Sequence, residues 1–310
     1  MNSLLDIQEK LQDTSAALAR LSGEIVRHPD SNSLRWDLKS LERRRDKLEL
    51  LMLSAASAQG REVCRYRLIP EQDRVRLSGL VGVLGGYQNV LTGFYHAKKS
   101  GKPKSRAVVS AESVEDTALD FGYAFAGSVG FVFTVPAERG LFNNSELGAS
   151  IQTIAELART RKPEEILRYA KELGAAPIRA LFKWADAHVK ASLNADIEWR
   201  HGDELLQKTL IQLPEFVRLR ETISATSEED VKEFTWNGVL QGADVGNRSF
   251  HFRPDSGDED IRGSSGEVIS QSQTATVPQR YTATLRKTTR VLFSTEEEKT
   301  SWELLELSPV

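Results

Sequence analysis

The sequence is poor in the residues that build covalent or metal-bound frameworks. It contains one cysteine, Cys64, and five histidines in 310 residues. A single cysteine excludes an internal disulfide framework and a cysteine-based zinc site, and a reducing cytoplasm is the natural compartment for such a chain. The histidines follow no HxH, HExxH or HxxxH spacing. We therefore expect no metal site and no cofactor.

We also expect no export signal, and the chain carries no strong net charge. Its first residues, MNSLLDIQEK, are acidic where a signal peptide has a basic region followed by an apolar one, which predicts a cytoplasmic protein. The 41 Lys and Arg residues nearly balance the 44 Asp and Glu residues, and the net charge of -3 gives no general attraction to nucleic acid. With 40% hydrophobic residues, the length is enough for two or three domains.

The first sixty residues predict a pair of helices. Hydrophobic residues recur at steps of three and four up to residue 25 and again from residue 34, which is the pattern of helices with one apolar seam. Pro29 and the polar residues beside it separate the two runs. We expect an antiparallel, coiled-coil-like hairpin over residues 1–56 that docks on the body of the chain or on another copy. Its seam consists of Leu4, Ile7, Leu11, Leu18, Leu21, Ile25, Leu34, Leu38, Leu41 and Leu48.

The remainder of the chain predicts two further domains, so the fold class is α+β. Residues 61–226 form a mixed α/β body, and short alternating runs over 227–310 are spaced as in a small five-stranded β-barrel, OB-like or SH3-like. In the body we expect helices at 145–159, 163–173, 177–192 and 214–226, and strands around 64–68, 119–135 and 195–199.

The stretch from Leu77 to Ala97 contains no charged residue. Its glycines do not follow the spacing of a phosphate-binding loop, and a membrane span is disfavoured by five glycines and several polar side chains. A third interpretation accounts for more of the pattern, because glycines lie on one helical face and leucines on the opposite one. We expect a helix between two layers, with a close neighbour along Gly79, Gly82, Gly86 and Gly93.

Basic residues follow this stretch in the sequence KKSGKPKSR. They are candidate phosphate contacts of a nucleic-acid-binding protein, and the residues concerned are Lys98, Lys99, Lys102, Lys104 and Arg106. The C-terminal barrel region opposes this interpretation, because Asp and Glu outnumber Lys and Arg there and would repel a polyanion. A nucleic-acid partner is therefore not the favoured one.

Two segments resemble a group of bacterial proteins. The strand segment DFGYAFAGSVGFVFTV and the barrel opening GVLQGADVGNRSFHF, together with a helical N-terminus, resemble uncharacterised bacterial proteins of mobile-element and phage-defence neighbourhoods. The resemblance implies a role in a defence system and transfers no site residues.

No pattern with catalytic spacing occurs in the sequence, so we expect a non-catalytic protein. The leading hypothesis is a cytoplasmic interaction and assembly protein, which would be a sensor or adaptor of an antiviral defence system and would form homo-oligomers or bind a protein partner. The alternatives are a nucleic-acid-binding accessory subunit and a membrane-acting effector through residues 77–97.

Overall fold

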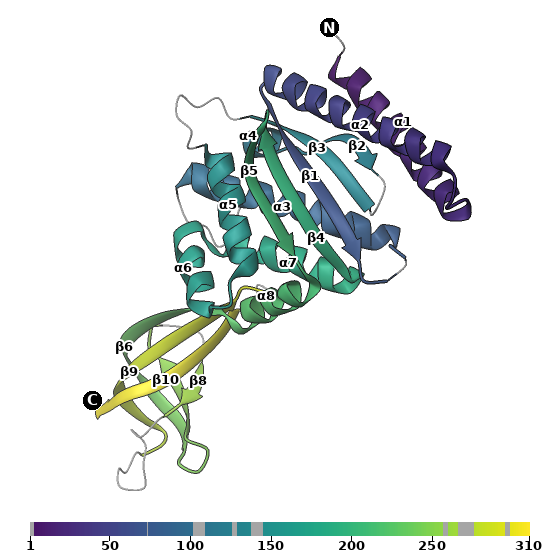
Figure 1. Ribbon diagram of the computed structural model, residues 1–310. Coiled ribbons are helices and arrows are strands. Elements are labelled where there is room, and N and C mark those ends of the chain that lie inside the picture. Colours follow the sequence, from purple (N-terminus) through teal and green to yellow (C-terminus); the bar gives the residue numbers. More distant parts are fainter. Residues whose placement is uncertain are drawn as a thin grey trace. The chain divides into compact units, whose positions relative to one another are not determined.

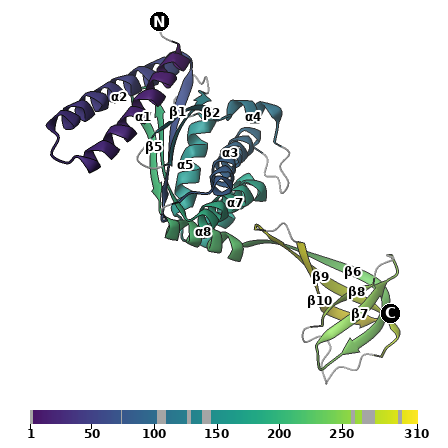
Figure 2. The ribbon, with the colours of Figure 1, turned by 90° about the vertical axis from the view of Figure 1, so that its right-hand side faces the viewer.

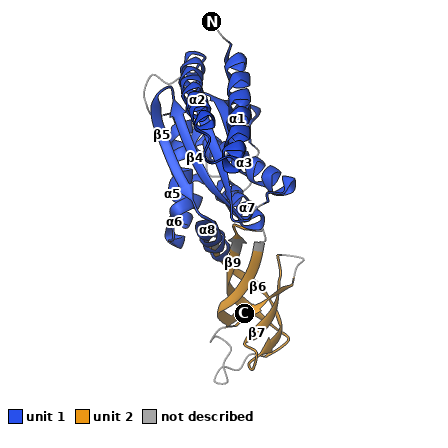
Figure 3. Ribbon diagram, turned by 45° about the vertical axis from the view of Figure 1, so that its right-hand side comes forward, with its two compact units in different colours: residues 1–225 blue, residues 226–310 orange. Residues whose placement is uncertain are grey.

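The computed structural model describes residues 3–72, 74–101, 109–125, 129–137, 145–256, 260–265, 276–294 and 298–310. The chain divides into two compact units, residues 1–225 and residues 226–310, which are coloured separately in Figure 3. The predicted fold class, α+β with a barrel near the C-terminus, is confirmed: the described residues form eight helices and a closed five-stranded barrel. The coiled-coil character of the hairpin and the OB-like or SH3-like type of the barrel stay predictions.

The first unit begins with two long helices that run side by side (Figure 1). Helix α1 spans Leu4–Arg27, and α2 spans Asn32–Ala58. Ser3 and Ser31 start them, since each side chain accepts a hydrogen bond from a backbone N–H of the first turn. Ile7 and Leu11 of α1 and Met52 and Ala56 of α2 are buried, and they pack with side chains of the sheet. The hairpin is thus docked on the body of its own chain.

A five-stranded sheet in the order β2-β3-β1-β4-β5 forms the centre of this unit, and all neighbouring strands are antiparallel. For residues 119–135 the alternating pattern is that of a pair of strands or of one long bent strand, and the structure has the pair, β2 and β3. Edge strand β5 is absent from the predicted elements, because Glu204, Leu205 and Leu206 do not alternate in polarity and are all exposed. The strands are β1 (Arg61–Pro70), β2 (Asp120–Phe125), β3 (Val129–Pro136), β4 (Leu193–His201) and β5 (Glu204–Ile211).

The other helices of the unit lie on the face of the sheet opposite to the hairpin, as Figure 2 shows. Buried side chains of β1 and β4, among them Tyr66 and Trp199, point to this face and meet Tyr87 of α3 and Trp184 of α7. The helices are α3 (Leu77–Ser100), α4 (Ala111–Asp116), α5 (Glu146–Arg159), α6 (Pro163–Leu173), α7 (Ala175–Ala191) and α8 (Leu213–Ala225).

Helix α3 contains the charge-free stretch, and its glycines face α7 as expected. A Cβ atom added at Gly79 would lie 2.9 Å from Ala191 Cβ, and one at Gly86 would lie 3.3 Å from Trp184 Cα. The expected burial of the leucine face holds only in part, because Leu77 is 74% exposed whereas Leu91 is buried. The side chains that α3 buries include Val83, Tyr87, Val90 and Phe94, a stripe between the predicted glycine and leucine faces. The helix therefore covers one face of the sheet and leaves its own outer side open.

The second unit is a closed barrel with strand order β10-β8-β7-β6-β9. Strand β10 closes it, because it pairs with β9 antiparallel and with β8 in parallel. The core includes Leu240, Phe252, Tyr281 and Leu304. The strands are β6 (Ser227–Asp244), β7 (Ser249–Pro254), β8 (Ile261–Ser264), β9 (Gln279–Leu292) and β10 (Glu298–Pro309), which agree with the five strand candidates of the sequence.

Candidate functional site

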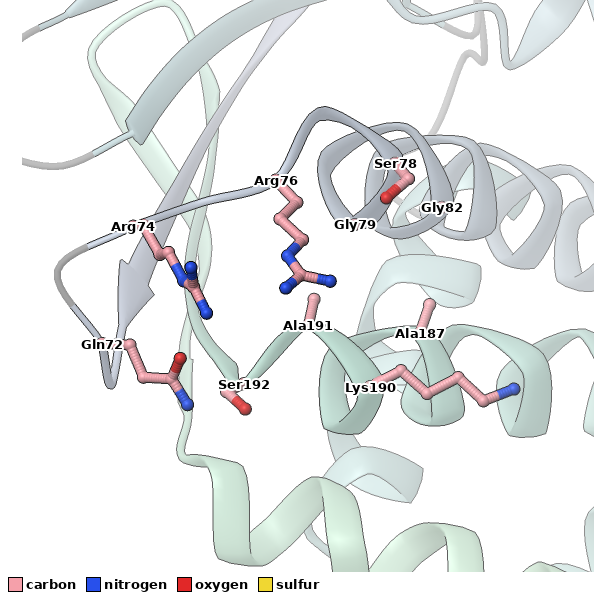
Figure 4. Close-up of a pocket in the computed structure, with 10 residues that line it drawn as sticks. All are labelled: Gln72, Arg74, Arg76, Ser78, Gly79, Gly82, Ala187, Lys190, Ala191 and Ser192. Atoms are coloured by element: carbon pink, nitrogen blue, oxygen red, sulfur yellow. The ribbon is translucent and has the colours of Figure 1, made fainter.

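A surface cavity of about 500 Å³ lies where two connections of the first unit meet. The connection from β1 to α3 forms one wall, and the end of α7 with its turn into β4 forms the other (Figure 4). The Glu71 backbone N–H donates to the Ser192 carbonyl at 3.1 Å, and the Asn194 side-chain amide donates to the Ile69 carbonyl at 3.0 Å. These hydrogen bonds hold the two walls at a fixed separation.

The glycine face of α3 shapes the floor of this cavity. Gly79 and Gly82 line it together with Ala187 and Ala191 of α7. Since neither glycine carries a side chain, the backbone at the start of α3 lies directly at the cavity surface. Ser78 and Ser192 add hydroxyl groups, and Gln72 adds a side-chain amide. The floor can therefore donate hydrogen bonds to a ligand.

The charged side chains among the described residues that line the cavity all carry positive charge. They are Arg74, Arg76 and Lys190, and no described acidic residue lines the cavity with them. Figure 4 shows the guanidinium groups of Arg74 and Arg76 reaching from the β1–α3 connection toward the end of α7. Neither arginine forms an ion pair or hydrogen bond with a described residue. Lys190 is different, because its Nζ lies 2.6 Å from Asp186 Oδ2.

The helix ends at the cavity do not add a decisive charge of their own. The N-terminus of α3 carries a partial positive charge, and Arg76 at its cap position provides no side-chain acceptor. The C-terminus of α7 beside it carries the opposite partial charge, so the two contributions oppose each other. The unpaired arginines therefore determine the electrostatics of the cavity. Two guanidinium groups within one cavity suit an anion with several oxygen atoms, since each group can donate two parallel hydrogen bonds.

No sequence pattern predicted these two arginines, which precede the charge-free stretch, as site residues. The signal that could have identified them is local: the sequence RVRLSG places two arginines directly before a helix whose first turn contains serine and glycine. Lys190 could not be found in this way, because it reaches the cavity through the packing of α7 on α3.

The predicted phosphate contacts lie at the opposite end of α3 or beyond it. Lys99 donates to Glu112 at 3.0 Å and to Asp116 at 2.8 Å, and these bonds raise the pKa of the Lys99 ammonium. The same lysine lowers the pKa of the Asp116 carboxyl. Lys98 is half-buried on the same helix, and Lys102, Lys104 and Arg106 lie outside the described residues. Of the predicted contacts, Lys98 and Lys99 therefore lie at the end of α3 away from the cavity.

The predicted seam residues line the contact between α1 and α2 to different depths. Ile7, Leu11 and Leu18 are buried, whereas Leu4, Leu21, Ile25, Leu34, Leu38, Leu41 and Leu48 are half-buried. Several apolar side chains outside the seam are exposed on the hairpin, including Val26 at 82% and Trp36 at 73%. Their role in binding a partner or another copy stays a prediction.

One of the histidines, His188, belongs to a buried network of aromatic side chains. His188 of α7 is 0% exposed and stacks on Phe216 at 3.9 Å. Its Nδ1 lies 2.8 Å from the Leu193 carbonyl, which can only accept, so Nδ1 carries the proton. The Tyr66 hydroxyl then donates to His188 Nε2 at 2.8 Å and accepts from Trp184 Nε1 at 3.0 Å. All polar atoms of this network have partners, which indicates a structural role.

No group of three or more potential metal ligands occurs within the described ranges. In the same part of the chain, no helix has the length and hydrophobicity needed to cross a membrane. No protein-family model matches the chain, and no curated protein or solved structure is significantly similar to it. The functional argument therefore depends on the geometry of the cavity.

Proposed function

We propose that the protein is a non-catalytic binding protein that recognises a small phosphate-bearing molecule in the cavity beside Arg74 and Arg76, and that assembles with a partner or a second copy through its helical hairpin. The observation that supports the first part is the presence of two arginines without ion-pair partners among the described residues, in a cavity that no described acidic residue lines. The volume of about 500 Å³ lies in the range of sites for small molecules rather than single ions.

The assembly part of the proposal follows from the apolar surface of the hairpin. Exposed side chains such as Trp36 and Leu50 remain on it although its inner side packs on the sheet. Coiled-coil-like pairing and homo-oligomer formation are the arrangements that we propose for this surface. A protein with one ligand site and one assembly surface suits the sensor or adaptor role implied by the resemblance to defence-associated proteins. We further propose that its small barrel, OB-like or SH3-like, is a second interaction module.

The ligand part is tested by titration of the full-length protein with inorganic pyrophosphate in a calorimeter. We expect saturable binding with one site per chain that weakens as the salt concentration rises, because the attraction is electrostatic. The double variant Arg74→Gln/Arg76→Gln should lose at least about tenfold in affinity, since each charge-assisted hydrogen bond contributes about 1.5–3 kcal/mol.

The matched control is the double variant Arg43→Gln/Arg44→Gln. Both residues are exposed on α2, so the control changes the net charge of the chain equally without touching the cavity. Pyrophosphate affinity should be unchanged in this control. Equal affinity losses in the two double variants would show a general charge effect and would contradict the proposal. Tight, salt-dependent binding of single-stranded DNA or RNA without pyrophosphate binding would support the nucleic-acid alternative instead.

A further inference from the structure

A second cavity, separate from the first, lies between helix α2 and the hairpin-facing side of the sheet. Its volume is about 280 Å³. Apolar side chains from α2 and from the strands form most of its wall, and these are Leu50, Met52, Leu53, Val63 and Val132. Met52, Val63 and Val132 also belong to the core that joins the hairpin to the sheet. The cavity therefore lies beside well-packed structure and opens to the surface at Leu50, which is 59% exposed.

Tyr123 of β2 gives this cavity a polar group that has no partner. The side chain lines the cavity and is 3% exposed. Its hydroxyl makes no hydrogen bond to any residue of the described ranges. Burial raises the pKa of this phenol, so it remains protonated and can donate a hydrogen bond at neutral pH. Because Tyr123 lines the cavity and its hydroxyl is not among the buried polar atoms that lack a partner, the hydroxyl is open to the cavity and can donate a hydrogen bond to a ligand there.

The charged residues around the cavity already compensate one another. Glu49 Oε2 lies 3.6 Å from Arg65 Nη1, and Asp46 Oδ1 lies 2.7 Å from Arg45 Nη2. Arg200 donates to Glu198 at 2.6 Å. The four charged lining residues, two acids and two arginines, sum to zero. A charged ligand would lose its hydration without gaining a free counter-charge, which disfavours it relative to a neutral one.

We infer that this cavity is a binding site for a small uncharged molecule. Its apolar part has about the size of one aromatic ring, and one polar atom accepts a hydrogen bond from the Tyr123 hydroxyl. The volume limits the size, since sites for drug-sized ligands start at about 300 Å³. The apolar wall favours an apolar ligand. Because the charged lining residues already pair with one another, an ionic ligand finds no free counter-charge. Because α2 forms one wall and the sheet the other, the bound molecule joins the hairpin to the sheet. The inference does not depend on the phosphate site.

The test uses phenol and indole as neutral probes, and benzoate and benzylammonium as charged ones, with the full-length protein. Binding is followed by ligand-observed NMR and by titration of the protein amide spectrum. We expect saturable binding of phenol to one site per chain, and benzoate and benzylammonium should bind at least tenfold more weakly. Absence of saturable phenol binding would overturn the inference, and so would tighter binding of either charged probe.

Two variants separate the cavity from nonspecific apolar binding. Tyr123→Phe should weaken phenol binding about 5- to 10-fold, while the melting temperature of the free protein stays unchanged or rises, because the lost hydroxyl had no partner. Leu53→Trp fills the cavity from its half-buried edge and should abolish binding of both neutral probes. The control Leu51→Trp alters a residue of α2 that is 45% exposed and does not line the cavity. Unchanged phenol affinity in both Tyr123→Phe and Leu53→Trp would overturn the inference.

Discussion

The buried network of Tyr66, Trp184 and His188 shows how single residues can be misjudged from sequence. In the sequence, Asp186 lies two positions before His188 and Lys190 two positions after it. Nothing local shows that α8 covers it, yet Phe216 of α8 stacks on its ring. The partner Tyr66 is 122 positions away in the chain. By contrast, the alternation around Cys64 predicted a strand correctly, because that signal is local.

The burial of His188 predicts a pH dependence of stability. Desolvation lowers its pKa from 6.5 to about 3 in the folded protein. Between these two values the unfolded chain binds the proton and the folded chain does not, so the free energy of unfolding falls as the pH falls. Below pH 6, the titration of His188 lowers the free energy of unfolding by about 1.4 kcal/mol for each pH unit.

The measurement is urea unfolding between pH 7 and pH 5 for the wild type and for His188→Gln. Glutamine can replace both hydrogen bonds of the imidazole without titrating. The difference in free energy of unfolding between the two proteins should shrink steadily as the pH is lowered. Parallel pH profiles would show that His188 does not titrate in this way.

At the scale of elements, the glycine pattern of α3 predicted a close neighbour but not which sides of the helix are buried. The spacing of Gly79, Gly82 and Gly86 is visible in the sequence, and α7 occupies that face. The rotation of the helix on the sheet depends on Tyr87, whose ring meets Tyr66 of β1 and whose hydroxyl accepts a hydrogen bond from Trp199 of β4. Such packing cannot be read from periodicity, because alternative stripes on one helix are similarly apolar. The same limit applies to the cavity at Arg76, where two elements distant in the sequence meet.

Two adjacent glycines of α3 provide a direct test of the close contact. A Cβ at Gly85 meets no atom within 4 Å, whereas one at Gly86 meets the Trp184 backbone at 3.3 Å. Gly85→Ala should therefore stabilise the protein by about 1 kcal/mol through helix propensity alone. Gly86→Leu should destabilise it by about 1–3 kcal/mol or more, because the added atoms separate α3 from α7.

Chemical denaturation of both variants checks this prediction. Similar free energies of unfolding for Gly85→Ala and Gly86→Leu would show that α7 does not lie against this face of α3. The variant Gly85→Leu is the size-matched control, because it adds the same side chain on the open side of the helix. It should retain a stability close to that of the wild type.

For the molecule as a whole, the sequence predicted which segments form helices, strands and the barrel. It predicted less well which of these elements pack against one another. The barrel could be predicted from five short alternating runs with turn residues between them. The hairpin could be predicted from its seam, and the structure places it with the sheet in one compact unit, residues 1–225. Neither cavity could be predicted, because each is lined by residues of elements far apart in the chain.

The central claim, that the anion site lies beside Arg74 and Arg76, is tested most directly by mapping the backbone amide signals of the full-length protein during pyrophosphate titration. Ser78, Gly79, Gly82 and Ser192 should shift together and saturate at one site per chain, since they line the same cavity. Signals near Lys98, at the other end of α3, should stay in place. Saturable shifts centred on Lys98, or no saturable shifts anywhere, would contradict the account.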